Sequence, residues 1–340
     1  MASSASERIE WVDTLKVIGI FYIYLGHFGK NAGYLHPFVF LFHVPLFFFI
    51  SGLFARKVST FSDARNTVIK SAKSILVPYF IFGFISLLIY SLKGGLDSHA
   101  TLMQLKSLIL AIRNNIFATS LWFLPCLFMV IVYYCIARLV LKNDLYVFLL
   151  SLALYFIAGH FSIASHPSLP WNIDSAIYYF VFYTIGSLAS PLLMSEANSR
   201  PKNWTNPLLL LICFLSVLFS IYSFYKPYGI YAYISSSFMR NMTSLFATVA
   251  LFIPQIILSN IIKFKFLSEI GKSTVVFCGT EQATKIVVVS FFSMIGCNIS
   301  LKSPLDTVIF SGICVVASYY LFAMPYNNIK NRKTNTLAGR

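Results

Sequence analysis

The sequence predicts an all-α polytopic membrane protein, with about ten transmembrane helices and with both the N- and C-termini in the cytoplasm. Of its 340 residues, 58% are hydrophobic and only 11% are charged, whereas a soluble domain has about 25% charged residues. The apolar residues gather in runs of about 20, the length at which a helix crosses a bilayer. Most lysines and arginines fall in every second connection between these runs.

Ten apolar runs are long enough to be membrane spans. They cover residues 14–33, 37–55, 74–92, 119–141, 145–164, 174–193, 206–225, 242–262, 273–295 and 305–324. The stretch 97–118 is apolar at helical spacing but carries Lys106 and Arg113. We therefore expect it to form a helix that lies in the membrane interface.

The basic residues predict the orientation and the location. An excess of lysine and arginine marks cytoplasmic connections, and the densest basic segment here follows the second run. No small-residue cleavage site follows the first run, which we therefore expect to be retained as a helix. The chain is predicted to be one integral-membrane domain, 1–340, in an inner (plasma) membrane, with short cytoplasmic tails 1–12 and 326–340.

Composition excludes several other classes of protein. The net charge of +15 is spread between apolar runs, unlike the continuous basic patch of a nucleic-acid-binding protein. The six cysteines form no C-x-x-C pair and lie mostly inside apolar runs, which is typical of packing thiols. We therefore predict no metal site and no nucleic-acid partner. Membrane lipids are the expected surroundings.

The first run carries two ionisable residues on one face. Lys16 and His27 are separated by close to three turns of a helix, or about 16 Å along its axis. Ionisable side chains within a membrane usually face the protein interior or a wet cavity. Asp13, one turn before Lys16, is placed to pair with it. The structural alternative is a snorkelling lysine and a histidine bonded to a neighbouring helix.

The second run returns through the membrane, so that its His43 is expected at a depth similar to that of His27. Pro45 removes a helical hydrogen bond close by, and Ser51 and Gly52 permit close helix packing near the inner end. Two imidazoles at one level predict a polar chamber. Alternatively, His43 caps the helix that Pro45 interrupts.

Four stretches, in order, resemble bacterial membrane O-acyltransferases of acyltransferase family three: DTLKVIGIFYIYLGH, FLFHVPLFFFISGLF, IKSAKSILVPYFIFG and LWFLPCLF. They are most similar to the branch of fucose 4-O-acetylases and related acetyltransferases. The resemblance returns at FLSEIGKSTVVF (266–277). It implies that Lys16 and His27 match a basic residue and an essential histidine of the family. Lys70 and Lys73 match an arginine pair, keeping the charge but not the planar guanidinium.

These residues suit transfer of an acyl group, most simply acetyl, from acyl-CoA to a hydroxyl of a surface polysaccharide or lipid-linked oligosaccharide. We expect the donor's phosphates at the inner mouth, where Lys16, Arg56, Lys70 and Lys73 lie; positive-inside topology alone also explains such charges. His27 would act as a general base or form a transient acyl-histidine. The residues leave both routes open.

Three further residues are candidates for the site. Glu281 takes about the place where the family commonly has a histidine, and could orient His27. Equally, it could form a neutral buried pair with Lys285 four residues on. Trp122 could stack on a sugar or belong to the aromatic belt of the membrane interface. We assign Asp13 and His43, with Trp122, to substrate binding.

Two other functions fit a helical bundle with a polar interior. A transporter or flippase for a lipid-linked glycan would show internal repeats, and none is visible. A glycan polymerase would usually show a large outer loop, which is also missing from the sequence. We therefore predict an O-acyltransferase, with acetyl-CoA as donor and a carbohydrate as acceptor, acting in polysaccharide modification.

Overall fold

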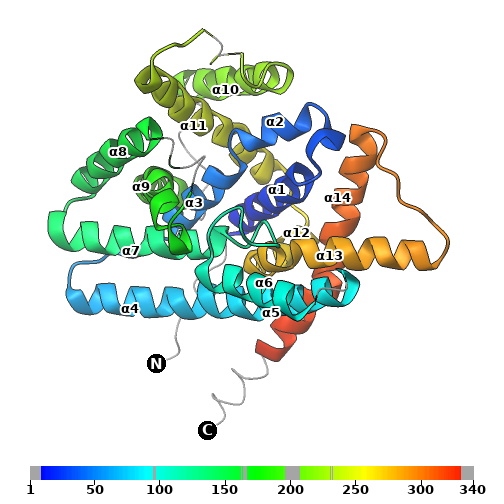
Figure 1. Cartoon of the computed structure of the whole chain (residues 1–340). Coiled ribbons are helices and arrows are strands. Elements are labelled where there is room, and N and C mark those ends of the chain that lie inside the picture. Colours follow the sequence, from blue (N-terminus) through cyan, green and yellow to red (C-terminus); the bar gives the residue numbers. More distant parts are fainter. Residues whose placement is uncertain are drawn as a thin grey trace.

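The computed structural model describes residues 9–94, 97–161, 163, 167–195, 207–229, 231 and 233–330, and it is helical with no strand among them (Figure 1). The α-helices are α1 (Glu10–Gly26), α2 (Leu35–Phe40), α3 (His43–Leu53), α4 (Phe61–Ser71), α5 (Val77–Gly94), α6 (Ser98–Leu110), α7 (Phe123–Leu141), α8 (Asp144–His160), α9 (Ile173–Ser195), α10 (Pro207–Tyr225), α11 (Ser237–Ile261), α12 (Lys265–Gly271), α13 (Thr274–Met294) and α14 (Pro304–Ser318).

The predicted class is confirmed: eight helical stretches of the described chain are long and apolar enough to cross a membrane. Two other predicted spans correspond to α1 and α8, which have 17 residues each. At 1.5 Å per residue such a helix measures about 25 Å, less than the roughly 30 Å of a hydrocarbon core. The count of ten spans and the side on which the termini lie remain predictions.

The second predicted span is not one helix. It consists of α2 and α3, which meet at Leu41 and Phe42, where the φ of Phe42 is −147°. Pro45 lies in the first turn of α3, where a proline costs no helical hydrogen bond. The first run is also shorter than predicted, since α1 ends at Gly26 and a 3₁₀ turn over Gly29–Ala32 follows.

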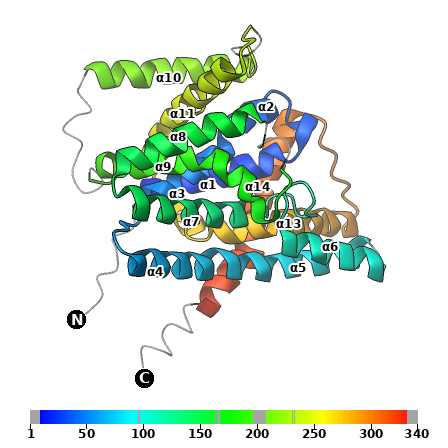
Figure 2. The ribbon, with the colours of Figure 1, turned by 60° about the vertical axis from the view of Figure 1, so that its left-hand side comes forward.

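The third predicted span is longer than expected. Residues Phe61–Lys93 form one helical rod, in which α4 joins α5 through a π-helical turn over Ala72–Leu76. Thr60 and Asp63 form a capping box that starts this rod in the segment that we predicted to be a connection. Lys70 and Lys73 therefore lie on the rod, and Figure 2 shows it along one side of the molecule.

The predicted interfacial helix is α6, and it is shorter than the stretch 97–118. It ends at Ala111, which adopts a left-handed conformation (φ 53°), and an irregular segment continues to Trp122. Leu108 is its buried contact with α5: it packs at Gly83, and its carbonyl accepts a hydrogen bond from the Tyr79 hydroxyl.

The core of the described chain is built around the crossing of α3 and α9, which lie in the interior in Figure 1. The two helices touch backbone to backbone at Gly52 and Gly186. A Cβ atom on Gly52 would collide with the Tyr183 carbonyl oxygen, and one on Gly186 with that of Phe49. This confirms the close approach predicted at Gly52. In contrast to this buried crossing, α10 lies at the edge of the molecule, where it packs on α11.

Helix α1 packs against helices from the last third of the chain. Short α12 packs against the start of α1, where Gly271 meets the backbone of Asp13. Helix α13 follows and also packs against α1. Part of each predicted tail is helical, since α1 begins at Glu10 and the last rod continues to Lys330. Residues 1–8 and 331–340 lie outside the described residues.

Candidate active site

His27 lies at the end of α1 and is its C-cap residue. Its backbone N–H donates to the Ile23 carbonyl at 3.2 Å. Its side chain is 21% exposed, so the imidazole is buried for the most part but not closed off.

Glu281 lies in the most deeply buried stretch of α13 and is fully buried. An isolated carboxylate in such surroundings costs several kcal/mol unless it is paired. Two cationic or ionisable side chains lie around the Glu281 carboxylate. These are His27 from the end of α1 and Lys285 from the next turn of α13 itself.

The three side chains form one cluster. His27 Nδ1 lies 3.1 Å from Glu281 Oε2, and Lys285 Nζ forms an ion pair with Glu281 Oε1. The two arrangements that the sequence left open for Glu281 thus occur together. The His27 contact is not aligned as a good hydrogen bond. Such contacts often tighten only when a substrate is bound.

Ser120 joins this cluster from the irregular segment before α7. Its hydroxyl lies 2.8 Å from the Cys278 carbonyl and 3.2 Å from Glu281 Oε2. Sequence analysis missed Ser120, although the LWFLPCLF stretch begins at the next residue. A serine directly before the aromatic stretch that carries the family resemblance was the available signal.

The turn of α13 before Glu281 is held by three other elements. Its successive carbonyls at Phe277, Cys278 and Gly279 accept hydrogen bonds from Tyr24 (3.4 Å), Ser120 (2.8 Å) and Ser86 (3.0 Å). These donors belong to α1, to the segment before α7 and to α5. The carboxylate is therefore positioned by a helix turn that the surrounding helices fix in place.

The other end of α1 holds Asp13 and Lys16, which form the predicted pair: Lys16 Nζ lies 2.9 Å from Asp13 Oδ1. The ammonium also lies 5.3 Å from the centre of the Phe54 ring, at the end of α3. Arg56 follows two residues later and is exposed. The structure thus brings Asp13, Lys16 and the start of the basic segment to one end of α1.

Lys70 and Lys73 lie apart from this group in the fold. Both are exposed, Lys70 near the end of α4 and Lys73 in the π-helical turn. Helix α4 packs against α7, whereas α1 packs against α12, α11 and α3. A π-helical turn is rare and often marks a functional position, but no contact ties these two lysines to Lys16.

His43 and Trp122 are packed by their own neighbours. His43 is 3% exposed, and its Nδ1 lies 2.7 Å from the Val39 carbonyl across the break between α2 and α3. Trp122 is 7% exposed. The guanidinium of Arg113 lies 4.3 Å from the centre of its ring, and Tyr179 packs at 5.8 Å. Neither side chain offers an open ring face to a sugar.

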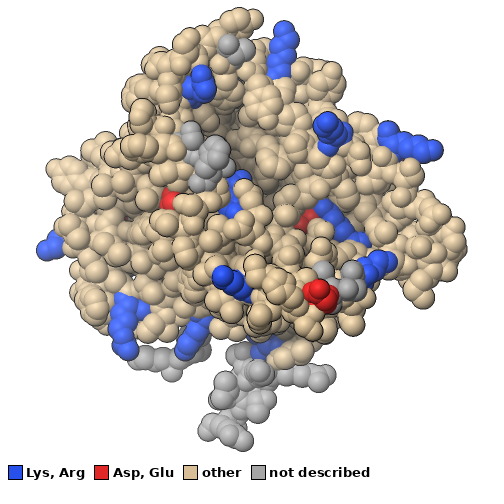
Figure 3. Space-filling view, viewed as in Figure 1, with Lys and Arg blue, Asp and Glu red and all other residues tan. Residues whose placement is uncertain are grey.

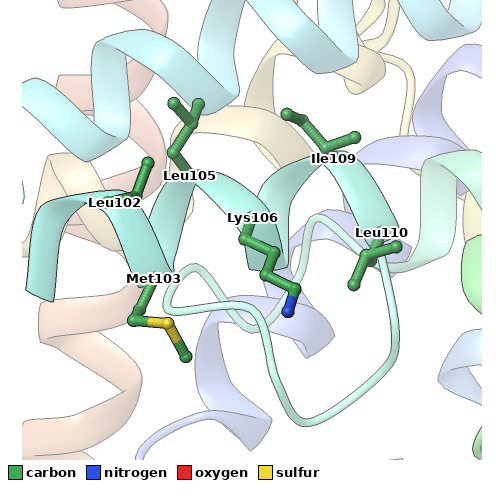
Figure 4. A pocket seen from close by; sticks show the side chains of 6 residues that line it. All are labelled: Leu102, Met103, Leu105, Lys106, Ile109 and Leu110. Atoms are coloured by element: carbon green, nitrogen blue, oxygen red, sulfur yellow. The ribbon is translucent and has the colours of Figure 1, made fainter. Parts of the chain in front are cut away.

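Figure 3 shows a largely uncharged face with a hollow near its centre, where α1, α2 and α3 lie in Figure 1, and charged side chains beside the hollow. A separate groove lies on α6, and Figure 4 shows its lining. This lining is Leu102, Met103, Leu105, Lys106, Ile109 and Leu110. It holds none of the residues of the cluster.

Among the described residues, no group of three or more histidine, cysteine, aspartate or glutamate side chains is placed to hold a metal ion. The ionisable cluster around His27 is instead one imidazole, one carboxylate and one ammonium. Chemically, this set can take up and release a proton at the imidazole and can keep a carboxylate charged beside it.

Comparison with known proteins identifies the family. Residues 9–323 match the acyltransferase domain of acyltransferase family three. The match extends from the first residue before α1 to the helical segment after α14, and therefore includes every side chain of the cluster. No curated protein and no solved structure matches the chain significantly. The chain belongs to acyltransferase family three.

Proposed function

We propose that this membrane acyltransferase is an O-acetyltransferase that moves an acetyl group from acetyl-CoA to a hydroxyl of a surface polysaccharide or a lipid-linked oligosaccharide. One observation carries the proposal. In a chain of this family, a fully buried carboxylate, Glu281, faces the Nδ1 atom of a partly exposed histidine, His27. That arrangement suits a general base.

His27 acts on the acceptor hydroxyl. With its proton on Nδ1, facing Glu281, the imidazole has an unprotonated Nε2 that accepts the hydroxyl proton as the oxygen attacks the acetyl carbonyl carbon. The thioester C–S bond then breaks, and the coenzyme A sulfur takes the proton from the imidazolium. Glu281 orients the ring and stabilises the imidazolium between these steps, as a carboxylate does beside a catalytic histidine.

The alternative route through acyl-histidine uses the same atoms. Nε2 attacks the acetyl carbonyl carbon and the C–S bond breaks, releasing the coenzyme A thiolate; the acceptor oxygen then attacks the same carbon, the C–N bond breaks, and the hydroxyl proton passes to the thiolate. Both routes require His27 to be unprotonated at Nε2 when the donor arrives. They differ in whether an acetylated enzyme forms without acceptor. Incubating the protein with labelled acetyl-CoA alone, quenching the reaction and looking for label on the protein would distinguish them.

Exposed basic side chains support the expected site for the donor's phosphates. Arg56, Lys70 and Lys73 are exposed, and Lys16 is partly so. They can therefore offer charged donors to phosphate oxygens. Lys16 stands about three helical turns from His27 on α1, a separation that the extended pantetheine arm would bridge. Asp13 holds Lys16 in place at this end.

This donor site requires the start of α1 to lie in the cytoplasm, as the distribution of basic residues predicts. We place the protein in the bacterial inner membrane with both termini in the cytoplasm. Reporter fusions test this orientation. They should report the cytoplasm after residues 65 and 200, and the opposite side after residues 95 and 170. An outside signal at residue 65 would remove the donor site.

A transporter of lipid-linked glycans is the rival function, and family membership argues against it. The deciding experiment is mass spectrometry of surface glycans from cells with the gene, without it, and with the His27→Ala variant. The proposal expects a fixed mass increase of one acetyl unit only with the unmodified gene. Glycans that change in amount but not in mass would contradict it.

A further inference from the structure

Lys285 is an ammonium inside the protein that the proposed reaction does not use. Its side chain is 11% exposed, and no acidic residue other than Glu281 pairs with it among the described residues. A buried lysine is costly unless its charge and its three N–H donors find partners. The positions of these partners show what Lys285 does.

The first additional partner is the carbonyl oxygen of Tyr24, 3.3 Å from Lys285 Nζ. This carbonyl belongs to the last turn of α1. In a continuing helix its partner would be the N–H of Phe28, but that N–H donates to the Leu25 carbonyl at 3.2 Å. The end of α1 thus leaves the Tyr24 carbonyl without its helical partner, and Lys285 supplies a donor.

The second additional partner is the ring of Phe28, whose centre lies 4.0 Å from Lys285 Nζ. A cation over an aromatic face is stabilised by the ring's electrons. Tyr24 and Phe28 lie on either side of His27 in the chain. Lys285 therefore contacts the backbone just before His27 and the side chain just after it, while it also pairs with the carboxylate that faces the imidazole.

We propose that Lys285 is a positioning residue that holds the end of α1 against α13, so that His27 faces Glu281, and that balances the Glu281 charge, so that His27 stays unprotonated. The second role rests on the proposed function, since only a base needs to be unprotonated. The first role depends on geometry alone. A neutral imidazole, a carboxylate and an ammonium together carry no net charge.

Other titratable groups also surround His27. On α13, Glu281 and Lys285 form the ion pair beside it and Cys278 lies near Glu281, while His36 of α2 and His43 of α3 lie within the electrostatic reach of His27. Cys314 of α14 interacts with Glu281 and Lys285. If Lys285 is removed, an uncompensated carboxylate faces the imidazole and favours its protonated form.

The test measures the protonation of His27 directly and needs no transferase activity. Diethyl pyrocarbonate acylates unprotonated imidazole, and mass spectrometry of the peptide that carries His27 gives the extent of modification at each pH. In full-length Lys285→Met and Lys285→Gln, the midpoint of His27 modification should rise by about one pH unit, the effect of a nearby charge. Lys285→Arg keeps the cation and should match the unmodified protein.

Transfer activity should follow the same direction. A base that holds a proton at neutral pH is inactive, so acetyl transfer by Lys285→Gln should fall about threefold at pH 7, by up to about tenfold at lower pH, and recover toward higher pH. Lys93→Met is the matched control. It removes an exposed lysine that also contacts α13, through Ser290 at 2.8 Å, and it should change neither curve. Exposed His160 serves as the internal reference.

An unchanged His27 midpoint in Lys285→Met and Lys285→Gln would overturn the charge-balancing role. Loss of folded protein in the Gln variant would assign Lys285 to folding and would also overturn the proposal. If the midpoint rises in a protein that modifies no glycan, Lys285 acts as proposed while the proposed reaction is wrong. The two failures are therefore distinguishable.

Discussion

His27 and His43 lie at two helix interruptions, and their surroundings differ sharply. His43 begins α3, is almost fully buried, and bonds through Nδ1 to a carbonyl four residues earlier. His27 ends α1, is partly exposed, and turns Nδ1 toward a carboxylate from α13. The His43 ring forms its hydrogen bond within its own segment of chain. The His27 ring is paired with a distant ionisable group and remains partly exposed.

The difference shows which feature of a membrane histidine indicates chemistry. Both residues are polar, both were expected at similar depth, and both lie beside a helix end. Burial and a backbone partner make His43 a capping residue, the structural alternative that the sequence left open. A carboxylate at one ring nitrogen and a partly exposed ring give His27 the arrangement that the proposed general base requires.

The largest expected effect comes from exchanging the charges of α13. Glu281→Lys combined with Lys285→Glu keeps an ion pair but removes the carboxylate from His27. Acetyl transfer should fall by about 10²-fold or more, while the amount of protein in size-exclusion chromatography in detergent stays near normal. Glu281→Gln should lose as much. A charge-exchanged protein with full activity would show that Glu281 only neutralises Lys285.

A smaller effect is expected at the basic segment. If Lys73 holds a phosphate of the donor, Lys73→Glu should raise the KM for acetyl-CoA about tenfold, equivalent to about 1.4 kcal/mol of binding, with kcat little changed. Lys73→Arg should be mild. Lys93→Glu, at the other end of the same rod, is the control. Equal losses of protein in both Lys73 variants would mean that Lys73 serves membrane orientation and does not bind the donor.

A still smaller effect is expected at Ser120, whose hydroxyl approaches both the Cys278 carbonyl and Glu281. Ser120→Ala should lower kcat roughly fivefold, the effect of losing about 1 kcal/mol of hydrogen bonding near the carboxylate. Ser86→Ala is a close control, because Ser86 bonds to the next carbonyl, that of Gly279, without reaching Glu281. Equal kcat changes in both variants would mean that Ser120 only tethers α13.

The smallest effect on catalysis is expected at His43. His43→Leu removes one hydrogen bond to the Val39 carbonyl, which still accepts the Phe42 N–H, and this should cost about 0.5–1.5 kcal/mol of stability and lower the Tm. Transfer activity per folded molecule should stay within about twofold. A folded but inactive His43 variant would contradict this distinction between the two histidines and would indicate that His43 takes part in substrate binding.

The sequence predicted the fold well because membrane spans follow from length and hydropathy. It predicted less of what depends on helix interruptions. The break between α2 and α3 follows from the backbone conformation at Phe42, which hydropathy does not report. The rod that carries Lys70 and Lys73 was not predicted in full because its first half, α4, is polar. In the site, spacing on one helix predicted the Asp13–Lys16 pair.

The contact of His27 with Glu281 joins residues far apart in sequence; the sequence offered it as one of two alternatives, and the packing of α13 against α1 shows that it occurs together with the Lys285 pair. Ser120 and the Lys285 contacts to Tyr24 and Phe28 were beyond sequence reasoning because they also join distant parts of the chain. Trp122 illustrates the opposite case. Its place at a helix start suggested a sugar platform, but Arg113 and Tyr179, from other segments, cover its ring.

The most direct test of the central claim replaces His27 and measures transfer from labelled acetyl-CoA at equal levels of folded protein. His27→Gln keeps a polar side chain of similar size but cannot act as a base, and His27→Ala removes the side chain. Our account predicts that transfer falls to background in both variants. A His27→Gln protein that retains most of its activity would contradict it, since His27 would then serve only as a hydrogen-bonding partner of Glu281.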